Sequence, residues 1–131
     1  MLSRLVLALA LVASPCLTSP SLAAGILDNR PAFSEANEPA KRPAVCEELR
    51  RMAAGLNSPD LRIDLAIVGQ LTAIRPNGAF WSMEMCRDLY VMCLAYQSSD
   101  LKVGDRVLFR GAYSRLDENH VVLGPCLADR Q

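Results

Sequence analysis

The sequence predicts a mainly β domain in which one short α-helix precedes five strands. Three observations lead to this fold class. From Leu61 onward, apolar residues such as Trp81, Met83 and Met85 alternate with polar ones, which is the period of a half-buried strand. Turn-forming residues separate these runs, as at residues 76–78 (Pro-Asn-Gly). Before Leu61, apolar residues instead recur at three- and four-residue steps, which is typical of a helix.

Residues 1–23 have the pattern of a secretory signal peptide. Arg4 supplies a positive head, an apolar run follows it, and Ser21 and Ala23 fit the small positions of a cleavage site, which places the cut after Ala23. A membrane anchor would need about 20 apolar residues, and this run is interrupted earlier. Lipid attachment at Cys16 is disfavoured by the residues before it. The sequence therefore predicts a periplasmic or secreted protein with no membrane span after signal cleavage.

The charge balance bears on the class of partner. The chain has 14 basic and 14 acidic residues, and loss of Arg4 with the signal peptide leaves 13 against 14 in the 108 remaining residues. Proteins that hold nucleic acid by its phosphates usually carry a basic excess, because phosphate neutralisation and counterion release drive their binding. Nucleic acid is therefore an alternative partner and not the favoured one.

Four cysteines remain after signal cleavage, and an even count in a small exported chain predicts two disulfides. Of the three possible pairings, we expect Cys86–Cys93 across a hairpin together with Cys46–Cys126. No two cysteines have the spacing of two to four residues that zinc sites use, and none has the spacing of a redox pair. We therefore expect no metal and no other cofactor.

The chain after the signal peptide divides into three parts. Residues 24–43 are rich in proline and polar residues without an apolar period, which indicates an extended leader outside the core. Residues 44–57 form the expected helix, since Glu47 lies in its first turn, Arg50 lies further along and Gly55 stands at its end. Residues 61–128 hold the strands.

Five strands are expected over residues 62–75, 80–86, 90–96, 105–113 and 120–127. The first changes the phase of its apolar residues around Gly69, which predicts a bulge or bend at that glycine. The segment between the third and fourth strands begins with Ser98-Ser99-Asp100, where a short helical turn is expected.

The order of these elements resembles the OB-fold. Residues 101–127 read LKVGDRVLFRGAYSRLDENHVVLGPCL, and residues 67–83 read IVGQLTAIRPNGAFWSM. A VGDRV start, a strand that ends in RG and a final hairpin are frequent in OB barrels of the anticodon-binding-like type. The resemblance, over residues 61–127, implies a five-stranded OB-like Greek-key barrel. It implies no single activity, because this fold hosts unrelated functions.

No residue set stands out as catalytic. His120 is the single histidine and lies beside a predicted turn, where a solvated role is favoured. Ser114 is near it in sequence, but nothing joins a nucleophile, a base and an orienting carboxylate into one group. Glu84 and Asp88 are of the kind that strand faces and turns carry routinely. We therefore expect a protein that is not an enzyme.

The resemblance instead places a ligand on the second and third strands, where OB-folds usually hold oligonucleotides or oligosaccharides. The candidate ligand-binding residues there are Arg75, Phe80, Trp81, Arg87, Tyr90 and Tyr96. Trp81 has two interpretations, a stacking platform or a core residue on one strand face with Met83 and Met85, and the second is favoured.

We accordingly expect an exported binding module for a protein or an envelope glycan. Single-stranded nucleic-acid binding is one alternative, suited by the fold but not by the charge. A structural or stress-related envelope protein without a small ligand is the other.

Overall fold

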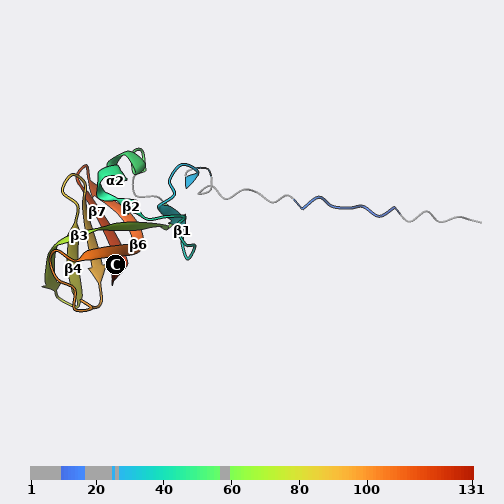
Figure 1. Cartoon of the computed structure of the whole chain (residues 1–131). Helices are drawn as coiled ribbons and strands as arrows, with labels where there is room; N and C mark the ends of the chain where they lie inside the picture. Colours follow the sequence, from blue (N-terminus) through green and yellow to red (C-terminus); the bar gives the residue numbers. More distant parts are fainter. Residues whose placement is uncertain (1–9, 17–24, 26, 57–59) are drawn as a thin grey trace, which may run out of the picture.

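The computed structural model describes residues 10–16, 25, 27–56 and 60–131. Most of the predicted signal peptide lies outside these ranges, as do residues 57–59, the first of which is the predicted end of the helix. Among the described residues, no helix is long and apolar enough to cross a membrane. The elements, labelled in Figure 1, are β1 (Phe33–Glu35), β2 (Ala44–Val45), α2 (Cys46–Met52), β3 (Ile63–Asn77), β4 (Phe80–Met85), β5 (Tyr90–Ala95), β6 (Arg106–Asp117) and β7 (His120–Arg130).

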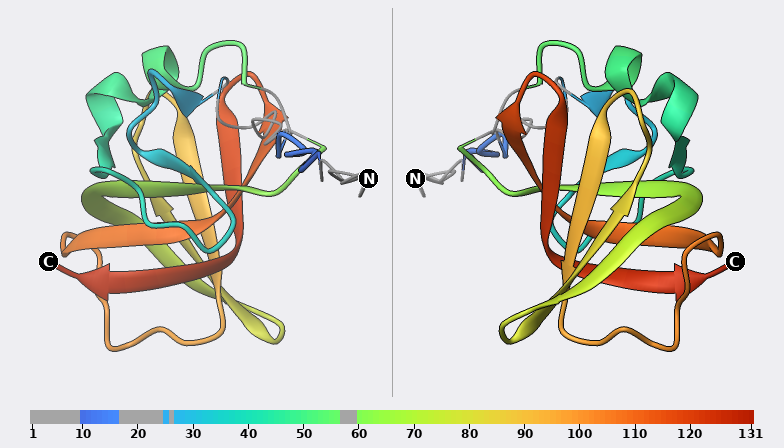
Figure 2. Two further views of the ribbon diagram at one scale, coloured as in Figure 1. Left: turned by 90° about the vertical axis from the view of Figure 1, so that its right-hand side faces the viewer. Right: turned by 90° about the vertical axis from the view of Figure 1, so that its left-hand side faces the viewer.

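The five long strands close into a barrel. β4 pairs antiparallel with β3 and β5, β7 pairs parallel with β5 and antiparallel with β6, and β6 returns to pair with β3. The resulting order, β3-β4-β5-β7-β6-β3, is the Greek-key order of the OB-fold. The predicted mainly β, five-stranded OB barrel is therefore confirmed. Figure 2 shows α2 over one end of this barrel and the β3–β4 hairpin at the other.

β3 pairs with two strands, β6 and β4, and thereby closes the barrel. Its residues 64–70 pair with β6, and residues 71–77 pair with β4, with a shift of register between Leu71 and Ala73. The bulge predicted at Gly69 thus lies a few residues further along. Gly69 has another role, since a Cβ there would lie 3.0 Å from the Cys46 sulfur and 3.1 Å from the Met85 sulfur. The glycine therefore makes room for a disulfide against the sheet.

The interior follows the period of two that the strands predict. Met83 and Met85 of β4, and Phe109 of β6, are fully buried. At the end that α2 covers, Leu49 is buried, and the ring of Phe33 packs edge-on against Tyr113 with centroids 5.1 Å apart. No regular helix joins β5 to β6, where a short helical turn was expected; residues 96–105 form turns and bends.

The leader differs from the prediction. β1 pairs antiparallel with β3, with Phe33 opposite Leu65, and β2 pairs parallel with β3. Ala32 and Phe33 are buried in the core. The expectation that residues 24–43 lie outside the core is wrong at these positions, because the first half of β3 has an edge to which the leader can add. A strand of three residues is too short to show a period.

The helix is shorter than predicted. α2 starts at Cys46 because Ala44 and Val45 are extended and pair with β3. The backbone N–H of Val45 donates to Glu48 Oε1 at 3.1 Å, which caps the first turn. The Arg42 guanidinium, 2.7 Å from the same oxygen, lowers the pKa of the Glu48 carboxyl through its hydrogen bond. Gly55, at φ 73°, follows the helix in a left-handed conformation that suits a helix end.

Two disulfides form, as predicted, but the expected pairing is wrong. The bonds are Cys46–Cys86, with Cα atoms 5.2 Å apart, and Cys93–Cys126, at 5.4 Å. In the β4–β5 register, Cys93 lies opposite Met83, whereas Cys86 follows the end of β4. Cys86 therefore cannot reach Cys93 and instead meets the start of α2. Cys16, expected to leave with the signal peptide, is exposed and unpaired in the described chain.

The pairing can be tested by removing one bond. The double variant Cys46→Ser, Cys86→Ser should lose about 4 kcal/mol of unfolding free energy, because the chain-entropy estimate for a loop of this length gives that value. Urea unfolding measures the loss, and peptide mapping without reduction should still find Cys93 joined to Cys126. A Cys86–Cys93 peptide in the wild-type protein would contradict the described pairing.

Candidate functional site

One side of the barrel carries a continuous set of outward side chains on β4, β5 and β7. Alternate residues of these strands, such as Met83, Val91 and Val121, are buried inside the barrel, so their neighbours point outward. We call this surface the barrel face. Its members are Phe80, Ser82, Glu84, Tyr90, Met92, Leu94, Tyr96, His120 and Val122.

An aromatic pair marks one end of the barrel face. Phe80, just after the β3–β4 turn, and Tyr96, just after β5, have ring centroids 5.0 Å apart at an interplanar angle of 39°. The pair is accessible, since Phe80 is 37% exposed and Tyr96 is 67% exposed. Arg75 lies opposite Ser82 in the β3–β4 register, at the same end.

A second aromatic pair marks the other end. Tyr90 lies opposite His120 in the parallel β5–β7 register, and the two rings stack with centroids 5.2 Å apart at 15°. The backbone N–H of Tyr90 donates to the carbonyl of Asn119 at 2.8 Å. Tyr90 is 42% exposed, so this pair also presents ring surface to solvent.

Partly buried aliphatic side chains lie between the two pairs. Glu84, Met92 and Val122 are aligned across β4, β5 and β7 by the strand registers. Leu94 covers Gly124, at which a Cβ would lie 3.6 Å from a leucine methyl carbon. The middle of the barrel face is therefore mainly apolar, with one carboxylate.

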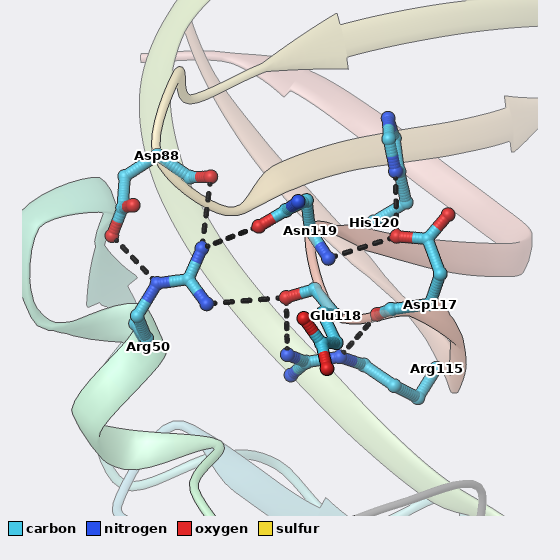
Figure 3. Close-up of polar contacts among 7 residues, drawn as sticks. All are labelled: Arg50, Asp88, Arg115, Asp117, Glu118, Asn119 and His120. Carbon is cyan, nitrogen blue, oxygen red and sulfur yellow. Dashed lines mark hydrogen bonds and ion pairs between the residues drawn. The ribbon is translucent and has the colours of Figure 1, made fainter.

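The Tyr90–His120 end is held by a polar network around Arg50 of α2 (Figure 3). The Arg50 guanidinium donates to the Asp88 carboxylate at 2.9 Å, and to the Asp88 carbonyl, the Asn119 side chain and the Glu118 carbonyl at 3.1 Å each. Its hydrogen bond with Asp88 raises the pKa of Arg50. Arg50 thus connects the β4–β5 loop to the β6–β7 hairpin. Tyr90 and His120 are the first residues of the strands that follow these two turns.

The β6–β7 hairpin holds His120 through Asp117. The Asp117 carboxylate accepts a hydrogen bond from the Asn119 backbone at 2.8 Å and lies 2.7 Å from His120 Nδ1. The bond with His120, followed by that with Asn119, lowers the pKa of the Asp117 carboxyl. Ser114 is aligned with Val122 and not with His120. In the described ranges, no group of three or more His, Cys, Asp or Glu side chains is placed to hold a metal ion.

The six residues predicted from the sequence do not form one cluster. Phe80, Tyr96 and Arg75 lie at one end of the sheet and Tyr90 at the other. Trp81 points to the inner side with Met83 and packs, partly buried, against the core. Arg87 is exposed in the β4–β5 loop.

The aliphatic middle of the barrel face, made by Met92, Leu94 and Val122, was missed. The residues predicted from the sequence are aromatic or cationic. The alternation along β5 carries the missing signal, because it places Met92 and Leu94 on the same side as Tyr90 and Tyr96.

Comparison with known proteins adds little to this description. No family model and no curated protein matches the chain. Among solved structures, a chain of the S. pombe Stn1–Ten1 complex is similar, with 14% identity, a TM-score of 0.39 and 54% of this chain covered. The match covers 60% of that chain's length. The OB-fold assignment rests on the strand order above, and this architecture suggests a binding module.

A core position and a surface position for Trp81 predict different losses of unfolding free energy when the residue is replaced by alanine. Trp81→Ala should lower the unfolding free energy by about 2–3 kcal/mol, somewhat less than the about 3–5 kcal/mol of a fully enclosed aromatic residue. Tyr96→Ala, at an exposed position, should change it by no more than about 0.5 kcal/mol. Urea denaturation measures both. Equal, small effects would show that Trp81 is not part of the core.

The Asp117 contacts predict a dependence on pH. Because its pKa is lowered in the folded state, Asp117 stabilises the protein above its unfolded pKa of about 3.9, and this contribution is lost as the pH falls through the lower folded value. Asp117→Asn should therefore lose less stability than the wild type between about pH 5 and pH 2. Urea midpoints against pH measure the difference, with Asp60→Asn as the control. Identical profiles for Asp117→Asn and the wild type would contradict the prediction.

Proposed function

We propose that this protein is an exported, non-enzymatic module that binds a protein partner through the barrel face. The observation that carries the proposal is the composition of that face, in which two accessible aromatic pairs flank Met92, Leu94 and Val122. Aromatic residues and methionine are enriched in the buried centres of protein interfaces, and a polar rim surrounds them.

The charges of the barrel face favour a protein over a polyanion. Arg75 at one end is countered by Glu84 in the middle of the face, and Arg50 near the other end is engaged by acceptors of the protein itself. Nucleic-acid binding relies on a basic groove along the backbone path. A mainly apolar surface with balanced charge suits a polypeptide with apolar side chains.

Two features support export. The N-terminal sequence has the secretory pattern, and two disulfides are consistent with an oxidising compartment. The polar groups near His120 support a non-enzymatic role, because their hydrogen bonds are made within the protein. Arg50 donates to the Glu118 carbonyl, and Asp117 accepts from the Asn119 backbone.

The barrel face can be tested with matched variants. Oxidised wild-type protein, immobilised and exposed to envelope extract from the cells that make it, should retain a partner protein that Leu94→Asp binds at least about tenfold more weakly. The reason is that the new charge would be buried without a partner in the interface. Val103→Asp is the control, because Val103 is 61% exposed in the β5–β6 loop and is not one of the residues of the barrel face.

Unfolding curves must first show that each variant folds. Retention of the same partner by all three proteins would contradict binding at the barrel face. Binding of single-stranded oligonucleotides with a steep salt dependence would replace the proposal with the nucleic-acid alternative.

Export is tested separately. The full chain, expressed in its source cells, should be recovered outside the cytoplasm with Ala24 as its first residue, as mass spectrometry of the intact protein would show. Recovery of the uncleaved chain from the cytoplasm, with free thiols, would contradict export.

A further inference from the structure

A pocket lies beside the barrel face, where β7 bends away from β5. Its volume is about 530 Å³, within the range of small-molecule sites. Segments far apart in the sequence line it: the leader, the start of β3, β6, the bend of β7, and Tyr96 after β5. Through Tyr96 it adjoins the Phe80–Tyr96 end of the barrel face.

Several of the residues that line this pocket are small and buried. Ser34, Ala66 and Cys126 are each less than a tenth exposed. Gly111 allows β6 to approach the bend, because a Cβ there would collide with the carbonyl oxygen of Pro125. The Cys93–Cys126 disulfide fixes the bend to β5. The pocket is therefore built from parts of the fold that are held in place.

The rim of the pocket is charged but balanced. Arg62 and Asp64 form an ion pair at 2.8 Å, and Arg110 lies 3.3 Å from Asp129, just outside the pocket. With Glu38, the lining carries two carboxylates and two guanidinium groups. A ligand with a net charge would gain no net attraction from this balanced set, and an apolar ligand would take the charged groups away from water without replacing their hydrogen bonds.

Apolar surface lies beside these charges, since Leu127 is the partner of Arg110 in the β6–β7 register and Tyr96 also lines the pocket. The Tyr96 side chain is 67% exposed and that of Leu127 is 64% exposed. A ligand that satisfies this lining therefore offers hydroxyl groups, which both donate and accept hydrogen bonds, together with a face of C–H groups. A sugar ring has this combination.

We propose that this pocket binds a neutral saccharide. The Arg62–Asp64 pair and Arg110 hydrogen-bond to its hydroxyls, and the Tyr96 ring packs against its C–H face. This site is separate from the protein-binding barrel face and shares only Tyr96 with it.

The test is an NMR titration of the oxidised, ¹⁵N-labelled protein with three neutral trisaccharides: maltotriose, cellotriose and triacetylchitotriose. At least one should shift the amide signals of Ser34, Gly111 and Leu127 saturably. Leu127→Ala, at an exposed position, and Asp64→Asn should each weaken this binding, the second by about tenfold through loss of charged hydrogen bonds. Leu94→Asp, on the barrel face, should leave it unchanged.

Three results would overturn the saccharide proposal: no saturable shift with any of the three sugars, shifts that lie away from the pocket, or tighter binding of trigalacturonic acid than of the neutral sugars. The two proposals fail independently. If the partner protein binds the barrel face, Leu94→Asp should weaken its retention and Asp64→Asn should not. If the sugar binds the pocket, Asp64→Asn should weaken sugar binding and Leu94→Asp should not.

Discussion

The structure depends on the way β3 is shared between two partners. Its first half pairs with β6 and its second half with β4, and the register shift between Leu71 and Ala73 lets one strand change partner. Without this change the sheet would stay open and β6 would have an unpaired edge. The first half of β3 also receives β1 and β2 on its other edge, so the leader, the helix and the barrel are all positioned by this one strand.

The geometry of the barrel face follows from that closure and from what covers one end of the barrel. Cys46–Cys86 joins the first residue of α2 to the residue that follows β4, and Arg50, one turn further along α2, reaches the β4–β5 loop and the β6–β7 hairpin. These contacts fix the two elements that carry Tyr90 and His120. At the opposite side, Cys93–Cys126 holds the bend of β7 where its pairing with β5 has ended. Each disulfide therefore supports one of the two candidate binding surfaces.

The strands that could be predicted from the sequence are those with apolar and polar residues alternating over several positions. Alternation placed β4 and β5 within one residue of their observed ends, and it also explains why Trp81 faces the core with Met83. β1 was missed because a three-residue strand has no measurable period. The bend of β3 was placed at Gly69, whose lack of a side chain instead serves a sulfur that arrives from residue 46.

The disulfides and the site required information that spacing along the chain does not contain. Cys86 and Cys93 are close in sequence, but the hairpin register opposes Cys93 to Met83, and the partner of Cys86 is set by where α2 docks. In the same way, Tyr90 was a candidate from the outset, whereas its stacking on His120 depends on the parallel β5–β7 pairing. Sequence patterns predicted the strands that carry the barrel face. The pairing of these strands determines which side chains lie next to one another on it.

Photo-crosslinking in intact cells shows directly whether the barrel face is the surface that contacts a partner. Benzoylphenylalanine replaces either Tyr90, on this face, or Val103, in the β5–β6 loop, both of which are exposed. If the barrel face binds a protein, position 90 should give a discrete protein adduct that position 103 does not give. Adducts of equal yield from both positions, or a nucleic-acid adduct from position 90, would contradict it.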